Sequence, residues 1–247
     1  MTRPSTLTKL AQNLRKSARA TTETYITYGL TESLFKSCSS LVEYTIPESQ
    51  RTQILTGKGP EKTVDGEDLG APALESANSI WFKELGMQPT FSTWSQVSYL
   101  HMYLLTVRLR ALGEESAFRQ YQQYLLEHFS QAAEEKMLLL HTISARSIRN
   151  KYLKDLFLRW RGVIAAYDEG LIEGDAVLAS AIWRNLYKGN EDADWEQIAL
   201  IVGYMRASIQ ELGRVQNTNE LSQGILDGPD GVWARSWQRV AEVGRGR

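Results

Sequence analysis

Apolar side chains recur every three to four residues through most of this chain, and the pattern is clearest between Arg146 and Tyr187. On a helical wheel, one group of apolar residues from this stretch falls within a single arc, as in an amphipathic α-helix. The group consists of Tyr152, Leu153, Leu156, Phe157, Trp160, Val163, Ile164 and Tyr167. Such a helix buries its apolar side against other helices, so this stretch constrains the fold more than any other.

The first helix of this stretch has a cationic outer face. Its basic residues outside the apolar arc are Lys151, Lys154, Arg159 and Arg161. Arg146 and Arg149 would project into the apolar arc, so we expect the helix to begin, or to kink, near Asn150.

An acidic segment with two glycines follows Tyr167 and is expected to end one helix and begin another. It contains Asp168, Glu169, Gly170, Glu173, Gly174 and Asp175. Glycine is common just after a helix, and a carboxylate oxygen can accept a hydrogen bond from a free N–H at the start of one. We therefore predict a second helix over 176–187 with Asp175 as its N-cap.

Other stretches with helical spacing predict helices over 21–41, 48–55, 76–85, 93–112 and 194–212, and one long helix or two over 114–142. Ser92 or Thr93 is the expected N-cap of the helix over 93–112. No strand-length alternating run and no fixed-period repeat compete with this pattern. The sequence therefore predicts an all-α fold, an irregular multi-helix bundle with an N-terminal helical arm and a flexible connector.

Composition divides the 247 residues into five segments. Residues 1–20 are basic, contain no acidic residue and are rich in Ser and Thr, which fits either a mitochondrial targeting segment or a solvated or disordered basic segment. Residues 21–55 form the helical arm, and 56–72, rich in Gly, Pro and charge, form the flexible linker. Residues 73–215 form the main helical domain, and 216–247 form a C-terminal tail.

Net charge and cysteine usage narrow the possible functions. A formal net charge of −1 excludes a globally basic nucleic-acid binder, so attraction to anionic partners must come from local patches. The single cysteine, Cys38, cannot form an internal disulfide, and we expect it to be a small buried hydrophobe. No apolar run approaches the roughly 20 residues of a membrane-spanning helix.

The histidines do not indicate a metal site. A helical di-iron site uses Glu-x-x-His, but Ser98, Leu125 and Leu138 stand three residues before the three histidines. His101 lies on an apolar stripe, so we interpret it as a hydrogen-bonded core or interface histidine. The sequence also lacks a phosphate-binding loop, a GxSxG elbow and a zinc-spaced Cys/His set. Enzymatic activity and a bound cofactor therefore have no positive support.

The acidic segment after Tyr167 could in principle hold a divalent cation, but it lacks the ligand order of an EF-hand loop. Helix capping and ion pairing with arginines explain it better. The cationic helix before it suits an anionic surface, such as ribosomal RNA, acidic lipid headgroups or an acidic protein. Alternatively, its basic residues pair with the acidic segment. We interpret the apolar arc, Trp160 included, as core rather than as a client groove.

Three blocks carry a resemblance to a known family. They are TTETYITYGLTESLFKSCSSLVEYTIP over 21–47, FSTWSQVSYLHMYLLTVRLR over 91–110, and KYLKDLFLRWRGVIAAYDEGLIEGDAVLASAIWRNLY over 151–187. In this order they resemble the ubiquinol-cytochrome c chaperone family, the assembly factors for mitochondrial cytochrome b. The resemblance extends over residues 21–214.

The resemblance implies an all-helical, non-catalytic protein that is peripheral to the matrix side of the mitochondrial inner membrane and could contact that membrane. We expect no cofactor and no DNA partner. The resemblance also implies three partners: a small helical subunit, the mitochondrial ribosome near its tunnel exit, and newly made cytochrome b, held until haem is inserted. A ribosome- or RNA-binding mitochondrial translation factor is the alternative. A helical haem- or metal-binding protein is the weaker third possibility.

Aromatic residues on or beside the apolar stripes are the candidate contacts for the small partner. They are Trp81, Tyr99, Tyr103, Tyr121 and Tyr124. Aromatic side chains are enriched in protein interfaces because they bury a large area at a small cost in side-chain entropy. We therefore expect the helical body to bind its partner through these side chains.

Overall fold

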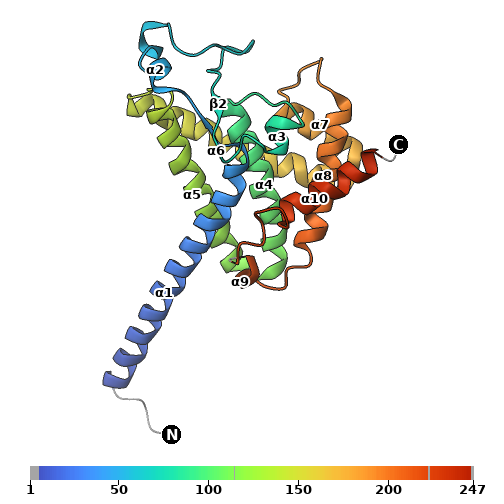
Figure 1. The fold of residues 1–247 in the computed structure, drawn as a ribbon. Helices are drawn as coiled ribbons and strands as arrows, with labels where there is room; N and C mark the ends of the chain where they lie inside the picture. The colour runs from blue at the N-terminus through green and yellow to red at the C-terminus, as the bar shows by residue number, and fades with distance from the viewer. Residues whose placement is uncertain (1–5, 114, 222, 246–247) are drawn as a thin grey trace.

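Helix α4 (Phe91–Leu112) is the central element of the computed structural model, which describes residues 6–113, 115–221 and 223–245 (Figure 1). Five other long helices contact it: α1 (Thr6–Ser39), α5 (Glu115–Leu139), α6 (Arg146–Glu173), α7 (Asp175–Leu186) and α8 (Trp195–Leu212). These helices fill most of the described chain, so the predicted all-α, multi-helix class is confirmed.

The remaining elements are short, apart from the last helix. They are η1 (Ser40–Val42), β1 (Tyr44–Thr45), α2 (Glu48–Arg51), η2 (Ile54–Thr56), β2 (Ala71–Pro72), α3 (Ile80–Lys83), α9 (Thr218–Leu221) and α10 (Val232–Arg245). The two strands pair antiparallel, with Tyr44 opposite Pro72 and Thr45 opposite Ala71.

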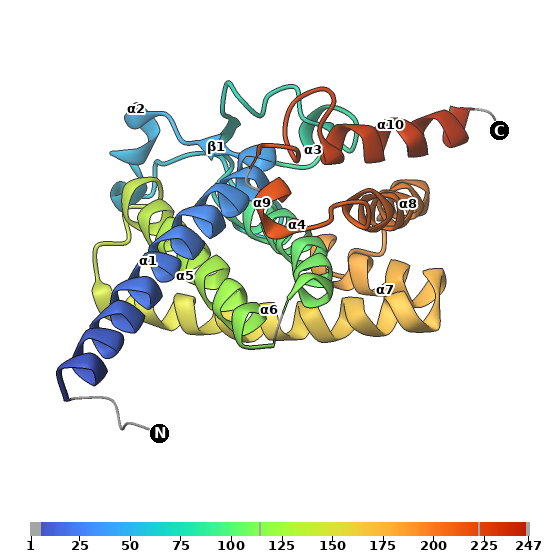
Figure 2. The ribbon, with the colours of Figure 1, turned by 90° about the horizontal axis from the view of Figure 1, so that it is seen from below.

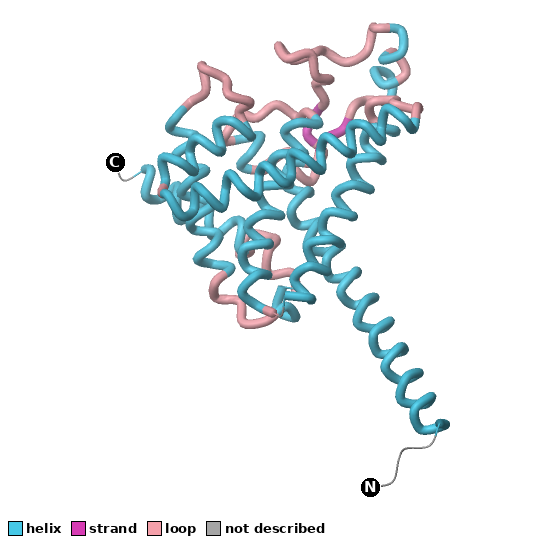
Figure 3. Tube along the Cα trace, turned by 180° about the vertical axis from the view of Figure 1, so that it is seen from behind, coloured by secondary structure: helices cyan, strands magenta, loops and turns pink. Residues whose placement is uncertain are grey.

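The long helices stack in layers. In Figure 2, α10 lies along one face, α8 lies next to it, α4 and α7 lie further in, and α6 runs along the opposite edge. Helix α1 crosses α4 and α5 with its second half, while its first half leaves the body, as Figures 1 and 3 both show. The outer side of α6 therefore faces away from the bundle over its whole length.

Helix α4 carries polar side chains that the surrounding helices must satisfy. His101 is fully buried, with its Nδ1 atom 2.8 Å from the carbonyl oxygen of Val97 and its Nε2 atom 2.7 Å from the hydroxyl of Tyr204 on α8. Burial lowers the pKa of His101 to about 4, although the hydrogen bond with Val97 raises it in part. The expectation of a hydrogen-bonded core histidine is confirmed.

The segment predicted as a C-terminal tail is part of the bundle. Helix α10 packs along α8, with Trp233 and Trp237 buried between them and the rest of the core. The indole N–H of Trp237 donates to Glu84 at 3.1 Å. The four-residue spacing of these two tryptophans was a signal for a packed helix, because large apolar side chains are more often buried than exposed to solvent in a tail.

Several predicted helix ends are wrong by a few residues. Helix α6 begins at Arg146 without a kink, because Arg149 turns back to Glu134 and to the carbonyl oxygens of the loop between α5 and α6. Helix α4 is capped by Thr90, whose hydroxyl accepts from the N–H of Thr93 at 3.2 Å, and neither Ser92 nor Thr93 is the cap.

Gly170 does not end α6, which continues to Glu173. It lies where α6 and α7 approach most closely: a Cβ atom at this position would be 2.6 Å from the Cα atom of Leu178. The glycine therefore permits close packing of two helices, and Gly174, with φ of +116°, makes the turn between them.

The segment 56–72, predicted to be a flexible linker, is anchored to the rest of the fold through residues 65–68. Asp68 accepts from His141 at 2.7 Å, and Lys188 lies 2.9 Å from carboxylate oxygens of both Asp65 and Glu67. Burial on its own raises the pKa of Asp68, but hydrogen bonds from Lys62 and His141 outweigh it, so the pKa lies below its usual value. The composition of the segment could not indicate these contacts, because His141 and Lys188 are distant from it in sequence.

Helix α1 joins the predicted basic segment to the predicted arm: residues 6–20 and 21–39 form one helix of 34 residues. The first five residues lie outside the described part of the chain, and the targeting role of 1–20 stays a prediction. Despite the length of α1, no helix among the described residues is apolar enough over a sufficient length to cross a bilayer.

Two glycines of α6 give a matched test of the packing. Gly170→Ala should destabilise the protein, because the new methyl group would overlap the backbone of Leu178. Gly162→Ala should stabilise it by up to about 1 kcal/mol through helix propensity alone, because nothing lies within 4 Å of the added atom. Denaturant unfolding of both variants measures the difference, and equal effects would contradict the close approach of α6 and α7.

Protonation of His101 should make the fold sensitive to acid. Its pKa in the folded state is about 4, below the 6.5 of an exposed histidine, so the unfolded state takes up the proton first as the pH falls. Stability attributable to His101 should therefore be lost between pH 6.5 and pH 4, by about 3 kcal/mol. The free energy of unfolding of His101→Gln should change less across this window, and a slope identical to that of wild type would count against the assignment.

Candidate binding surface

The four basic residues singled out from the sequence lie together on the outer side of α6. Lys151, Lys154, Arg159 and Arg161 are all exposed. None of them lies within ion-pair distance of a carboxylate among the described residues. The structure therefore places a cationic surface on α6, and we call these four residues the basic face.

The acidic segment after Tyr167 does not neutralise the basic face. Asp168 accepts two hydrogen bonds from Arg110 of α4, at 2.7 and 3.0 Å, and one from the hydroxyl of Tyr103 at 2.9 Å. Asp175 pairs with Arg206 of α8 at 2.9 Å. The predicted pairing with arginines holds for Asp168 and Asp175, whose partners come from other helices, but Glu169 and Glu173 make no ion pair among the described residues. The alternative, in which the basic face pairs with this segment, is wrong for Asp168 and Asp175.

Apolar side chains accompany the basic face. Leu158 stands between Lys154 and Arg161 on the outer side of α6 and is 52% exposed, and Ile148 near the helix start is also exposed. Leu158 was not among the residues singled out from the sequence, although its position outside the apolar arc, among cations, was a usable signal. A surface that combines unpaired cations with exposed aliphatic groups suits a binding partner better than plain solvent.

The predicted apolar arc of α6 is buried at its centre and exposed at its edges. Trp160, Val163 and Tyr167 are buried, which confirms their assignment to the core. Tyr152 and Phe157 mark the two edges of the arc and are 48% and 45% exposed. The wheel gives the direction of the arc, but its buried width depends on which helices cover it.

The aromatic residues proposed as a partner interface do not form a surface. Trp81, Tyr99 and Tyr103 are fully buried inside this chain, so their assignment to an exposed interface is wrong. Tyr121 and Tyr124 on α5 are half-buried, and Tyr124 packs edge-on against a ring of α1. The buried rings fill the space around α4, and their number reflects the size of the core.

Asp175 is not the N-cap of α7. Gly174 occupies that position without a side-chain hydrogen bond, and Asp175 is the first helical residue. The carboxylate turns to Arg206, which also donates to the carbonyl oxygens of Leu171 and Gly170 at the end of α6. Arg206 thus ties the α6–α7 junction to α8.

The part of the chain that matches known proteins includes α6, which carries the basic face. A family model described as ubiquinol-cytochrome C chaperone matches residues 83–227, which include all of α4 to α8. The match covers more than half of the chain. The chain belongs to the ubiquinol-cytochrome C chaperone family. The predicted resemblance is therefore confirmed, and the basic face lies within the segment that defines the family.

Three curated relatives illustrate the family. The mitochondrial protein CBP3 of Saccharomyces cerevisiae is 34% identical over 161 residues, which are 65% of this chain and 48% of the relative. Ubiquinol-cytochrome-c reductase complex assembly factor 1 of Xenopus laevis is 26% identical over 58% of this chain and 70% of the relative. The human factor of the same name is 24% identical over 66% of this chain and 50% of the relative.

The chain therefore spans about half the length of several of these family members. No solved structure is similar to the chain. The family description is that of a chaperone, and the Xenopus and human relatives are assembly factors by name, which agrees with a binding surface.

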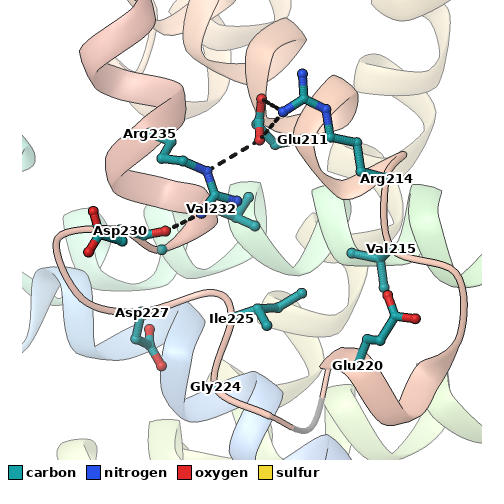
Figure 4. A pocket seen from close by; sticks show the side chains of 11 residues that line it. Glu211, Arg214, Val215, Glu220, Gly224, Ile225, Asp227, Asp230, Val232 and Arg235 are labelled. Atoms are coloured by element: carbon teal, nitrogen blue, oxygen red, sulfur yellow. Dashed lines mark hydrogen bonds and ion pairs between the residues drawn. The ribbon is translucent and has the colours of Figure 1, made fainter.

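Two pockets among the described residues are lined by ion pairs of the fold. One of about 450 Å³ lies between the end of α8, α9 and the start of α10 (Figure 4). Its most buried charge, Glu211, is only 7% exposed and pairs with Arg214 at 2.9 Å and with Arg235 at 3.3 Å. Another pocket of similar size is lined by Lys136, which pairs with Glu43 and lies over the rings of Tyr44 and Trp94.

Glu211 and Lys136 therefore connect helices of the fold through their ion pairs. The described residues contain no cluster of His, Cys, Asp and Glu that could bind a metal ion. Tyr44, His141 and Asp68 form a hydrogen-bonded chain, but burial, followed by the nearby carboxylates, raises the pKa of Tyr44, which keeps the phenol protonated. This chain fastens the segment 56–72 to β1 and α5.

Substitutions at the α6–α7 junction test the role of Asp175. Asp175→Ala and Asp175→Ser should cost the same small amount, up to about 1 kcal/mol, because an exposed ion pair is lost in both. Arg206→Ala should cost more, about 1–3 kcal/mol, because two carbonyl oxygens lose their donor. Denaturant unfolding measures the three losses. Recovery of stability by Ser but not by Ala would restore the capping interpretation.

Proposed function

We propose that this protein is a non-catalytic assembly chaperone for ubiquinol-cytochrome c reductase, respiratory complex III, in mitochondria. The observation that carries the proposal is the family match over α4 to α8, together with relatives whose names are those of mitochondrial or complex III assembly factors. The all-helical fold, with its charges used in ion pairs and its basic face exposed, supports a role in binding.

The proposed client is newly synthesised cytochrome b, held with a small helical partner subunit beside the mitochondrial ribosome. A location at the matrix side of the inner membrane follows from these partners. The basic face supports the ribosomal contact, because unpaired cations near a tunnel exit meet the phosphates of ribosomal RNA. Its exposed aliphatic groups, Leu158 and Ile148, add the apolar component that a protein partner requires.

A ribosome- or RNA-binding translation factor is the second candidate, and the unpaired basic face favours it. The two candidates differ in what holds the complex together. Contacts dominated by phosphate weaken steeply as salt rises, whereas apolar contacts with a client do not. Recovery of cytochrome b with the tagged protein after ribosomes have been washed off with salt supports the chaperone. Loss of cytochrome b and ribosomes together over the same salt range favours the RNA-binding factor.

Charge reversal on the basic face tests the ribosomal contact. Lys151→Glu with Lys154→Glu should leave the melting temperature nearly unchanged, because neither side chain makes an ion pair within the described fold. Association with mitochondrial ribosomes should weaken at least about tenfold, since each reversal turns an attraction into a repulsion. Co-sedimentation with purified ribosomes, and separately with anionic liposomes, measures the effect.

The matched control is Lys58→Glu with Lys83→Glu, which changes the same charge at two exposed positions away from α6. Ribosome binding should survive in the control. Unchanged binding of the α6 variant to both ribosomes and liposomes would remove the basic face from the proposed function.

A further inference from the structure

The outer side of α6 carries opposite charges at its two ends. The basic face extends from Lys151 to Arg161, just past the middle of the helix, with the exposed Asp155 among its cations. The exposed carboxylates Glu169 and Glu173 lie near the C-terminal end. Neither carboxylate lies within ion-pair distance of a described cation. In Figure 2 this side of α6 forms the free edge of the molecule, with α7 and α4 on its inner side.

Exposed apolar and small residues run between these charges. Leu158 is 52% exposed and Ile172 is 81% exposed. Between them lie Gly162, whose missing Cβ would meet nothing within 4 Å, and the exposed Ala165. The centre of the face can therefore accept the side chains of another helix at close range.

We propose that this face of α6 pairs antiparallel with the same face of a second copy of the chain. A two-fold axis opposite the midpoint between Arg161 and Gly162 brings Lys151 and Lys154 of each helix near Glu169 and Glu173 of the other, whereas Arg161 lies beside the axis, near its own copy. Lys154 and Glu169 lie equally far from that midpoint, so each lysine meets the partner's carboxylate. Leu158 and Ala165 are equally far from it too, so a large side chain meets a small one on both sides.

Charge complementarity selects a second copy over a uniformly charged partner. An anionic membrane or RNA laid along the whole face would meet Glu169 and Glu173 and be repelled there. An acidic helix would meet the same repulsion. A second copy of this face, running antiparallel, places Lys151 and Lys154 of each copy near Glu169 and Glu173 of the other. One helix pair buries less area than stable interfaces do, so the dimer is expected to be weak and dependent on concentration and salt.

Pairing through α6 would cover Lys151 and Lys154. A dimer therefore could not make the ribosomal contact through this face, and self-association would compete with it. This last step rests on the proposed function, whereas the pairing itself does not.

Reciprocal charge reversal tests the pairing with the full chain. Sedimentation equilibrium at low salt should show a monomer–dimer equilibrium for wild type. Lys151→Glu with Lys154→Glu, and separately Glu169→Lys with Glu173→Lys, should each weaken the dimer at least about tenfold, because like charges then face one another. An equimolar mixture of the two variants should dimerise at least as well as wild type. Lys58→Glu with Lys83→Glu is the control and should dimerise normally.

A wild-type protein that stays monomeric at every concentration would overturn the proposal. A mixture of the two variants that dimerises no better than each variant alone would overturn it as well. Unchanged melting temperatures confirm that the variants fold.

The Glu169→Lys, Glu173→Lys variant separates the pairing from the ribosomal contact, because it keeps the basic face. It should lose the dimer and retain ribosome binding. A monomeric wild type that still binds ribosomes through Lys151 and Lys154 would refute the pairing alone, and a dimer without ribosome binding would refute the ribosomal contact alone.

Discussion

The structure depends on enclosing α4, a helix that is buried on nearly every side and yet carries polar groups. Three of these groups find partners on neighbouring helices, whereas the hydroxyls of Ser95 and Thr106 donate to carbonyl oxygens of α4 itself. His101 bonds to Tyr204 of α8, the hydroxyl of Tyr99 donates to the carbonyl oxygen of Leu156 at 2.9 Å, and that of Tyr103 donates to Asp168. The tyrosines fix the position of α6 against α4 as well as filling space.

These internal bonds determine what remains available at the surface. Because Tyr103 and Arg110 of α4 engage Asp168, this carboxylate is held against the bundle, whereas Glu169 and Glu173 of the same segment stay exposed. Asp175 is drawn to α8 by Arg206 in the same way. The cations on the outer side of α6 are left without partners as a result. The binding surface is thus a consequence of how the core satisfies its own polar groups.

The periodicity of apolar residues was sufficient to predict the helices, the all-α class and the cationic side of α6, because these follow from local spacing. Local spacing does not determine which neighbouring helices pack over each apolar stripe. Tyr99 and Trp160 both lie on apolar stripes, as do Tyr152 and Phe157, but only the first two have another helix above them. Likewise, Gly170 marks a close approach and not a helix end, since Leu178 occupies the space beside it. Asp68 and Lys188 find partners across the fold that composition cannot indicate.

The order of charges along α6 also acts on the helix itself. The peptide dipoles of a helix add up to a partial positive charge at its first turn and a partial negative charge at its last, so stability favours acidic residues early and basic residues late. Helix α6 has the reverse order: no acidic residue in its first turn, no basic residue in its last, cations in its first half and Glu169 and Glu173 in its second. Each misplaced end charge costs about 0.3–1 kcal/mol when exposed. The helix therefore owes its stability to the core contacts of its inner side, which leaves the outer side free to carry charges that a solitary helix would avoid.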